Sequence, residues 1–383
     1  MRSIVWMVTL AFAVVGCAGA PASADPADPA PAEDGGVELA DAGVGGSPDG
    51  GGATGPDLDA GPAITAPRNT WTWVDVPGSA CDDGSPTGLA VNLTDSPNVL
   101  VFMNGGGACW DATSCLVLNV AVHGPIGRTQ FEVFRATFAD SVLDRSLAGS
   151  PFAGWNLVWI PYCTGDLHGG QNVATYTRLT GEPRAYHHVG HLNVLADLRR
   201  LAPTFANARK VVLAGSSAGG FGAMLNQPAF HAAFPASTLM VLDDSGPMIE
   251  GFRPEAVAGF FANWRLDLLV DPVCGPGCRT DLSLMHSGLA ALGDRTALLS
   301  STRDATMRTY AGLSAPEFEA ALRSLERERV RPSPGDRVFF VDGTTHTMLH
   351  HPARFSQDGV SLLPWLTWLV DADPAWASVI PRE

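Results

Sequence analysis

The chain has 383 residues, of which 46% are hydrophobic and 16% are charged. A chain of this length and apolar content can build one large domain or two ordinary ones. Its formal net charge is −15, and Lys210 is its single lysine, which argues against a function in nucleic-acid binding.

The N-terminus has the pattern of an export signal. A short basic start, 1–3, precedes an apolar stretch, 4–15, that is too short to span a bilayer comfortably. The ending Val-Val-Gly-Cys17 resembles a bacterial lipobox, whose cysteine becomes the lipidated N-terminus. An ordinary signal peptide or a membrane anchor is the alternative. We therefore expect residues 1–17 to be removed as a lipoprotein signal. Because Ala18 stands where an inner-membrane retention signal has Asp, we expect an exported protein, lipid-anchored to the outer membrane or cell surface.

Residues 18–68 consist mainly of Ala, Pro, Gly and Asp. They carry nine acidic residues and no basic residue before Arg68. A segment with so few large apolar side chains cannot bury enough surface to offset its ordering entropy. It is predicted to be a disordered tether, followed by a single domain over 69–383.

Six cysteines remain after Cys17, at positions Cys81, Cys109, Cys115, Cys163, Cys274 and Cys278. An even number in an exported protein favours disulfides, but six cysteines allow fifteen pairings. Two pairs are close enough in sequence for small loops, 109 with 115 and 274 with 278, which leaves 81 with 163. A metal knuckle over 274–278 is disfavoured, because no second ligand pair accompanies it.

From residue 71 the composition becomes globular, and apolar runs alternate with helical patterns. Runs of this kind predict strands at 71–76, 88–93, 98–103, 156–161, 211–214, 238–242, 296–300 and 337–341. Helical spacing is found at 187–201, 221–230, 254–270, 315–329 and 355–370. Strands alternating with helices predict an α/β fold, with a mainly parallel central sheet and helices on both faces.

The strand at 211–214 ends in Gly215-Ser216-Ser217-Ala218-Gly219, and a helix follows. A Gly-x-Ser-x-Gly turn between strand and helix exposes the middle hydroxyl at the carboxyl end of the sheet. Ligand sites on such sheets lie at that end. A plain strand-to-helix turn is the alternative for this stretch alone. Ser217 is thus a candidate nucleophile.

A serine nucleophile needs a histidine base, which follows it in the chain order of α/β-hydrolases. His346 lies just after the last predicted strand, in the turn Gly-Thr-Thr-His. His350 and His351 are close rivals, but His346 is nearest to the strand end. A loop or capping role is the alternative.

The acid that orients this histidine usually follows the penultimate strand. Asp304 stands there, after the strand at 296–300. It could instead cap a helix or pair with a neighbouring arginine. Asp243 and Asp244 compete with it, since the acid can also follow the preceding strand.

Three glycines, Gly105, Gly106 and Gly107, end the predicted strand at 98–103. A backbone without side chains can approach a ligand closely. An N–H from this run, together with the N–H of Ala218, would form an oxyanion hole. A flexible turn is the alternative.

The ordered set Phe-Met-Asn-Gly-Gly-Gly-Ala-Cys (102–109), Tyr-Cys-Thr-Gly-Asp (162–166) and Gly-Ser-Ser-Ala-Gly-Gly (215–220) resembles the pectinacetylesterase and Notum carboxylesterase family. The resemblance covers about 81–350. It implies an α/β-hydrolase of carboxylic esters without metal or cofactor. It implies Ser217, Asp304 and His346 as the triad, Gly106, Gly107 and Ala218 as oxyanion donors, and disulfides Cys109–Cys115 and Cys81–Cys163.

Two positions depart from the family pattern. The family elbow commonly has cysteine where this chain has Ser216, and its glycine run often ends in tryptophan where this chain has Gly107. We expect a monomeric serine esterase, pectinacetylesterase-like, that acts on acetylated polysaccharide or another acyl ester and meets the membrane only through its lipid anchor. A non-catalytic binding protein, an amidase or peptidase, or a polyester hydrolase are the alternatives. The histidines His168, His187, His188 and His191 are expected to have structural roles and to bind no metal.

Overall fold

The computed structural model describes residues 61–382, and the account below concerns this part of the chain. The predicted signal peptide 1–17, the predicted lipidation site Cys17 and most of the predicted tether lie outside it. The end of that tether, 61–68, lies inside it and packs on the domain. Ile64 is 6% exposed, and its amide donates to Oγ1 of Thr204 at 2.7 Å. The expected tether boundary at residue 68 is therefore too late, because this segment has an apolar side chain to bury.

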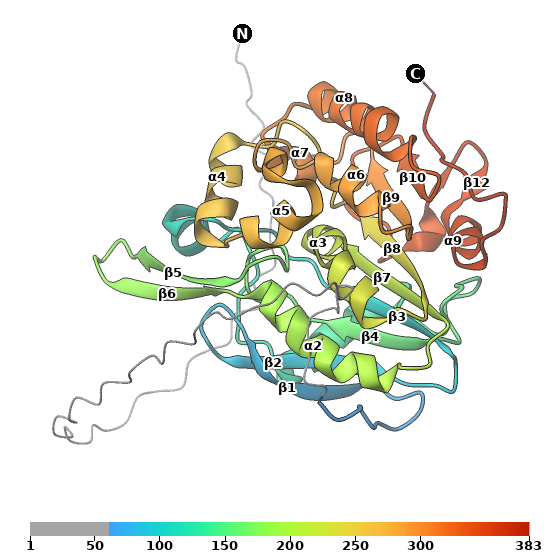
Figure 1. The fold of residues 1–383 in the computed structure, drawn as a ribbon, viewed down its shortest axis with the longest axis horizontal. Helices are drawn as coiled ribbons and strands as arrows, with labels where there is room; N and C mark the ends of the chain where they lie inside the picture. Colours follow the sequence, from blue (N-terminus) through green and yellow to red (C-terminus); the bar gives the residue numbers. More distant parts are fainter. Residues whose placement is uncertain (1–60, 383) are drawn as a thin grey trace, which may run out of the picture. The chain divides into compact units, whose positions relative to one another are not determined.

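An eight-stranded sheet organises the domain (Figure 1). The strands are β1 (Thr72–Ala80), β2 (Pro86–Asn92), β3 (Asn98–Met103), β4 (Asn156–Ile160), β7 (Lys210–Ser216), β8 (Thr238–Asp244), β9 (Arg295–Ser301) and β10 (Asp336–Val341). They lie in the order β1-β2-β4-β3-β7-β8-β9-β10. β2 is antiparallel to both neighbours, and every pair from β4 to β10 is parallel. This is the mainly parallel sheet of an α/β-hydrolase, as predicted.

Helices cover both faces of the sheet. Val99 and Val101 of β3 join a core shared with α2 (Gly190–Thr204), α3 (Ala218–Ala233), α6 (Leu284–Ala290) and α8 (Ala315–Leu325). The alternate residues Leu100 and Phe102 join a second core shared with α1 (Arg128–Phe134) and α9 (Leu362–Asp371). A strand buried on both faces needs apolar residues at every position, which explains its uninterrupted apolar run.

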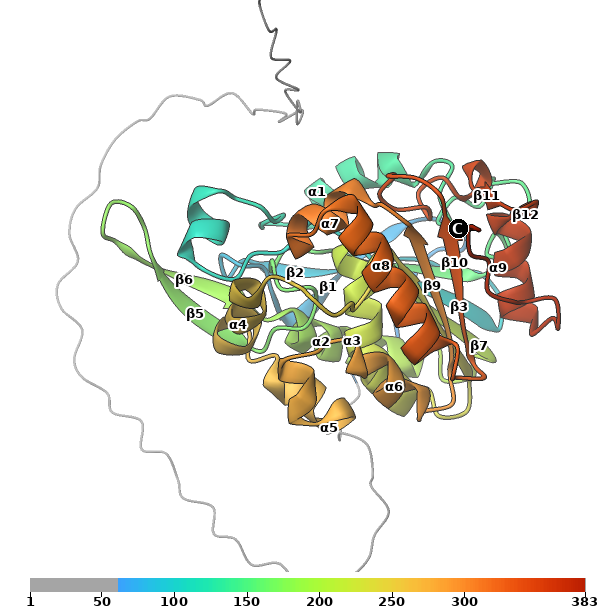
Figure 2. The same cartoon turned by 90° about the horizontal axis from the view of Figure 1, so that it is seen from above.

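The remaining elements lie beyond the sheet. β5 (Asn172–Thr177) and β6 (Pro183–His188) form a hairpin that projects from the domain beside α4 (Pro254–Asn263), as both views show (Figure 2). The others are α5 (Asp267–Cys274), α7 (Ala305–Ala311), the small hairpin β11 (Ser356–Gln357) and β12 (Val360–Ser361), and short helical turns at Thr113–Val117, Arg135–Phe138, Pro276–Arg279, Glu326–Val330 and Pro352–Arg354.

Three helix predictions need correction. The helix expected at 355–370 begins only at Leu362, because the preceding segment pairs as the hairpin of β11 and β12. The helix expected at 187–201 begins at Gly190, because the preceding segment pairs as β6 with β5. The helix expected at 254–270 is divided into α4 and α5. Arg265 lies between them with φ 59°, a left-handed conformation that a continuous right-handed helix cannot contain.

The six described cysteines form three disulfides, Cys81–Cys163, Cys109–Cys115 and Cys274–Cys278. These are the pairs that the resemblance and the short sequence spacings led us to expect. Among residues 61–382, no helix combines the length and the apolar character needed to cross a bilayer.

Candidate active site

Ser217 stands at a sharp turn between β7 and α3. Its backbone has φ 58° and ψ −122°, which L residues rarely adopt, and α3 begins at the next residue. A Cβ on Gly215 would collide with the carbonyl oxygen of Gly219, and a Cβ on Gly219 would collide with that of Met103. Both glycines are therefore required by close packing of strand, turn and helix. The turn has the geometry of a nucleophile elbow.

His346 and Asp304 meet across the carboxyl ends of β9 and β10. Nδ1 of His346 lies 2.8 Å from Oδ2 of Asp304, whose carboxylate is fully buried. Oδ1 of Asp304 accepts from the amides of Thr306 and Met307 at 2.9 Å each, so the same carboxylate also caps α7. Nε2 of His346 is buried and has no hydrogen-bond partner within 61–382. A carboxylate on Nδ1 favours the tautomer protonated there, which leaves Nε2 as an acceptor.

The rival residues take no part in this pair. Neither His350 nor His351 makes a hydrogen bond to Asp304, and burial lowers the pKa of His350. Asp243 accepts from a nearby glycine amide, and burial raises its pKa well above the usual range. Asp244 binds backbone amides of the loop that follows His346 instead of the histidine ring. The acid and the histidine brought together are therefore the two that the sequence favours.

The glycine run after β3 lies against the elbow. A Cβ on Gly105 would lie 3.0 Å from Cβ of Ser217, which shows how closely the two loops approach. Gly107, Ser217 and Ala218 line one pocket, whereas Gly106 is not among the lining residues. Three of the four residues expected around the reacting carbonyl thus face a common space.

The carbonyl groups of the glycine run accept hydrogen bonds from surrounding residues, and these bonds hold the run in place. The carbonyl of Gly106 accepts from the amide of Val122 at 2.7 Å, and that of Gly107 accepts from the hydroxyl of Tyr162 at 2.8 Å. In a trans peptide the following N–H points away from the carbonyl. The amide of Gly107 is therefore directed away from Val122. Tyr162 is a supporting residue that sequence reasoning did not identify, since a buried tyrosine at a strand end has no distinctive pattern.

An apolar pocket opens beside Ser217. The space between its walls amounts to about 640 Å³, part of which is open solvent. Its other lining residues are Ala108, Trp110, Leu167, Phe221, Leu225, Met248, Phe252, Ala256, Phe260, Leu266, Leu282, Met307 and Tyr310. Six of these thirteen come from the segment after β8, from α4 or from α7. The sequence indicated the helix at α4 but neither α7 nor this pocket, because apolar residues of this kind are equally typical of core packing.

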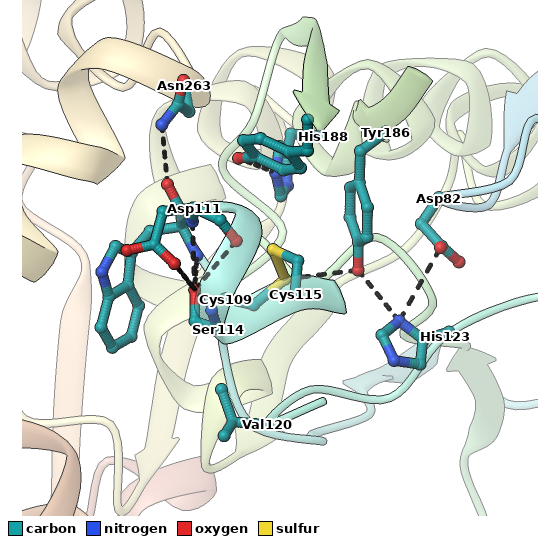
Figure 3. The surroundings of a disulfide bond; sticks show 12 residues. Asp82, Cys109, Asp111, Ser114, Cys115, Val120, His123, Tyr186, His188 and Asn263 are labelled. Atoms are coloured by element: carbon teal, nitrogen blue, oxygen red, sulfur yellow. Dashed lines mark hydrogen bonds and ion pairs between the residues drawn. A yellow bond between two sulfur atoms is a disulfide. The ribbon is translucent and has the colours of Figure 1, made fainter. Parts of the chain in front are cut away.

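The disulfide Cys109–Cys115 closes the short loop that carries Trp110, a wall of this pocket (Figure 3). The amide of Trp110 donates to Oγ of Ser114 at 2.9 Å, and its carbonyl accepts from Nδ2 of Asn263 at 2.7 Å. The main chain that carries the indole is thus held at both its amide and its carbonyl group. On the other side of the disulfide, the hydroxyl of Tyr186 lies 3.3 Å from Sγ of Cys109.

The four histidines noted in the sequence contact protein groups. Nε2 of His168 lies 2.9 Å from the carbonyl oxygen of Asn104, at the start of the glycine run. The ring nitrogens of His188 contact the Tyr176 hydroxyl and the Thr164 carbonyl. Nδ1 of His191 contacts Asn226, and Nδ1 of His187 contacts the carbonyl of Asp82. Burial lowers the pKa of His168 to about 4, so its imidazole is neutral and supports the loop by hydrogen bonding alone.

A family model described as pectinacetylesterase matches residues 70–258, which include the glycine run and the elbow. The chain belongs to the pectinacetylesterase family. Family relatives include palmitoleoyl-protein carboxylesterase notum1′ of Xenopus laevis, 28% identical over 204 residues, or 51% of this chain and 38% of the relative. Human palmitoleoyl-protein carboxylesterase NOTUM is 28% identical over 175 residues, or 43% of this chain and 34% of its own. Pectin acetylesterase 7 of Arabidopsis thaliana is 28% identical over 187 residues, or 45% of this chain and 44% of its own. The match thus spans less than half the length of each of these relatives.

Proposed function

We propose that this protein is a serine carboxylic-ester hydrolase. The observation that carries the proposal is the contact between Nδ1 of His346 and Asp304, which leaves a free acceptor at Nε2, in a fold that presents Ser217 on a strained elbow. A nucleophile, a base and an orienting acid in these positions form the triad of α/β-hydrolases. The names of the family relatives, which are carboxylesterases and a pectin acetylesterase, agree with this reaction class.

In the proposed reaction, Oγ of Ser217 attacks the ester carbonyl while Nε2 of His346 takes its proton. The carbonyl oxygen becomes an oxyanion, which accepts hydrogen bonds from the amides of Gly106, Gly107 and Ala218. When the intermediate collapses, the ester C–O bond breaks and His346 gives its proton to the leaving alcohol. Water then attacks the acyl-enzyme, His346 takes one of its protons, and that proton returns to Oγ as the acid leaves.

We further propose that the acyl group of the substrate enters the apolar pocket beside Ser217. Every pocket residue named above except Ser217 and Tyr310 offers only apolar atoms, glycine backbone or an indole there. Burial of each methylene is worth about 0.8 kcal/mol, or roughly a fourfold gain in binding. An acyl chain of several carbons should therefore be preferred over acetate. An acetylated polysaccharide fits the pocket less well, because its acetyl group would leave most of the pocket unfilled.

Nitrophenyl esters with acyl chains from acetate to palmitate test this proposal, with acetylated pectin and xylan as parallel substrates. We expect kcat/KM to rise with chain length until the pocket is full, and Ser217→Ala to abolish turnover. A preference for acetate would contradict the acyl-pocket assignment. Failure of the wild type to hydrolyse any ester or to react with a fluorophosphonate would identify a binding protein instead.

We also propose that the protein is exported and lipid-anchored through Cys17. The lipobox-like N-terminus supports this, and so do the three disulfides, since structural disulfides persist in oxidising compartments. Labelling with a radioactive fatty acid, lost in Cys17→Ser, is the expected result. Equal labelling of both forms would contradict the anchor.

A further inference from the structure

Three non-glycine residues with left-handed backbone conformations lie close to the candidate triad. They are Ser217 with φ 58°, Ser245 with φ 65° and Thr347 with φ 66°. Thr347 directly follows His346, and a β-branched residue at positive φ is a genuine outlier. Such a residue is strained and persists only when its surroundings hold it there. Something must therefore brace the loop that carries His346.

The carboxylate of Asp244 binds this loop directly. It is fully buried and accepts from the amide of Met348 at 2.9 and 2.8 Å and from the amide of Leu349 at 2.8 Å. Ser245 adds a bond of its own, because its Oγ accepts from the amide of Thr347 at 3.2 Å. The backbone on the carboxyl side of His346 is thus fixed at three consecutive amides.

Asp244 also binds the nucleophile elbow. Oδ2 of Asp244 accepts from Oγ of Ser216 at 2.7 Å, and the carbonyl of Asp244 accepts from the amide of Ser217 at 2.7 Å. On the amino side of His346, the loop is held by β9 and the start of α7: Oγ of Ser301 donates to the carbonyl of Thr345 at 2.7 Å. Within 61–382, hydrogen bonds connect Asp244 both to the elbow and to the loop after His346.

We propose that Asp244 is a positioning residue for the reaction, which fixes the imidazole of His346 relative to Oγ of Ser217. It does not touch the ring itself. Its buried carboxylate binds both the elbow that carries Ser217 and the loop that follows His346. The strained residues Ser217 and Thr347 therefore cannot relax away from each other. This inference rests on the proposed function, because positioning has meaning only if Ser217 and His346 exchange a proton.

Asp243 provides a matched control. It is the neighbouring residue on β8 and is equally buried, but its Oδ1 accepts only from the amide of Gly246 at 2.8 Å. An asparagine at 243 therefore leaves the His346 loop untouched. Both carboxylate oxygens of Asp244 lie within hydrogen-bond distance of the amide of Met348, so an asparagine at 244 sets its NH2 group against that donor in either orientation, and the loop must shift.

The test compares Asp244→Asn with Asp243→Asn, using the full chain and a nitrophenyl ester, with kcat normalised to sites titrated by a fluorophosphonate. Because a misplacement of about 1 Å can cost roughly a hundredfold in rate, we expect Asp244→Asn to lower kcat by about ten- to a hundredfold. KM should change less than about threefold, since neither Asp244 nor the loop 347–349 lines the acyl pocket. Asp243→Asn should keep kcat within about threefold of wild type. A purely structural role would lower the melting temperature and the number of titratable sites but not kcat per site.

Wild-type kcat per site in folded Asp244→Asn would overturn the inference. If that variant does not fold, Ser245→Ala decides, since it removes the acceptor for the amide of Thr347 together with the hydroxyl that donates to Oδ1 of Asp244 at 3.2 Å. A fall in kcat of more than about twofold supports the bracing role, and a kcat within about twofold of wild type overturns it. An inactive wild type would instead overturn the proposed function itself, so the two failures are distinguishable.

Discussion

Replacing Asp304 with asparagine should inactivate the protein while leaving its fold intact. Oδ1 of Asp304 is held by two backbone amides, from Thr306 and Met307, at 2.9 Å each. An asparagine must offer its single oxygen to these donors, because turning the amide would set its NH2 group against both. The NH2 group is then directed at Nδ1 of His346. That nitrogen becomes the acceptor, the proton moves to Nε2, and Nε2 can no longer take a proton from Ser217.

The size of the loss follows from this geometry. To restore the active tautomer, the asparagine must turn over and leave two buried amides unpaired, at about 1–3 kcal/mol each. The total is about 2–6 kcal/mol, which corresponds to a decrease in kcat of roughly 30-fold to 10⁴-fold. Tautomer exchange of this kind costs about 10⁴-fold in a serine protease, at the upper end of this range.

The measurement is steady-state hydrolysis of a nitrophenyl ester, together with thermal unfolding. Asp304→Asn keeps the cap of α7, so its melting temperature should remain close to that of wild type. Asp304→Ala is the control, because it loses the cap as well, at about 0.5–2 kcal/mol. The reasoning is refuted if folded Asp304→Asn retains more than a tenth of the wild-type kcat.

Three further perturbations have defined outcomes. Ser217→Gly should unfold at a higher temperature than Ser217→Ala, by about 1 kcal/mol in stability, because glycine relieves the positive φ; equal melting temperatures would contradict the strain. Tyr310→Ala should shift the ester preference towards longer or bulkier acyl chains, whereas Tyr310→Phe, which removes only the hydroxyl bonded to the Val120 carbonyl, should not; an unchanged profile in both would contradict a wall role. Burial lowers the pKa of His286 from 6.5 to about 4, so its stabilising neutral form is fully present above pH 6.5 and is lost as the pH falls towards 4. In the wild type, the free energy of unfolding should fall by up to roughly 1.4 kcal/mol per pH unit in this window because of His286, and His286→Leu should not show this fall in urea unfolding. Parallel plots of unfolding free energy against pH for the two proteins would contradict it.

The elbow and the strands of the parallel sheet could be predicted from the sequence, because their causes are local. Gly215 and Gly219 are required by contacts within the turn and with the adjacent strand β3. The continuous apolar runs reflect burial on both faces of a parallel sheet. By contrast, the split between α4 and α5 depends on the single backbone conformation of Arg265, which has no sequence signature.

The choice between acids could be favoured from the sequence but not decided there. Asp244 and Asp304 both follow parallel strands, so their carboxylates emerge at the same edge of the sheet. Only the path of the loop around His346 determines which one meets the ring and which one meets the backbone. The pocket residues were out of reach for the same reason: a phenylalanine such as Phe260 packs in the core and lines the pocket with the same side chain.

The two departures from the family pattern are each matched by a contact elsewhere in this chain. A Cβ on Gly107 would collide with the hydroxyl of Tyr310 and the carbonyl of Val120, so a large side chain at 107 and Tyr310 in its present place exclude one another. The pocket wall next to Gly107 is supplied here by Tyr310 from α7. Ser216 is 1% exposed, and its hydroxyl needs a partner that a cysteine would need less; it donates to Asp244. Substrate preference must accordingly be argued from Tyr310 and its neighbours, because Tyr310 occupies the space that a large side chain at 107 would need.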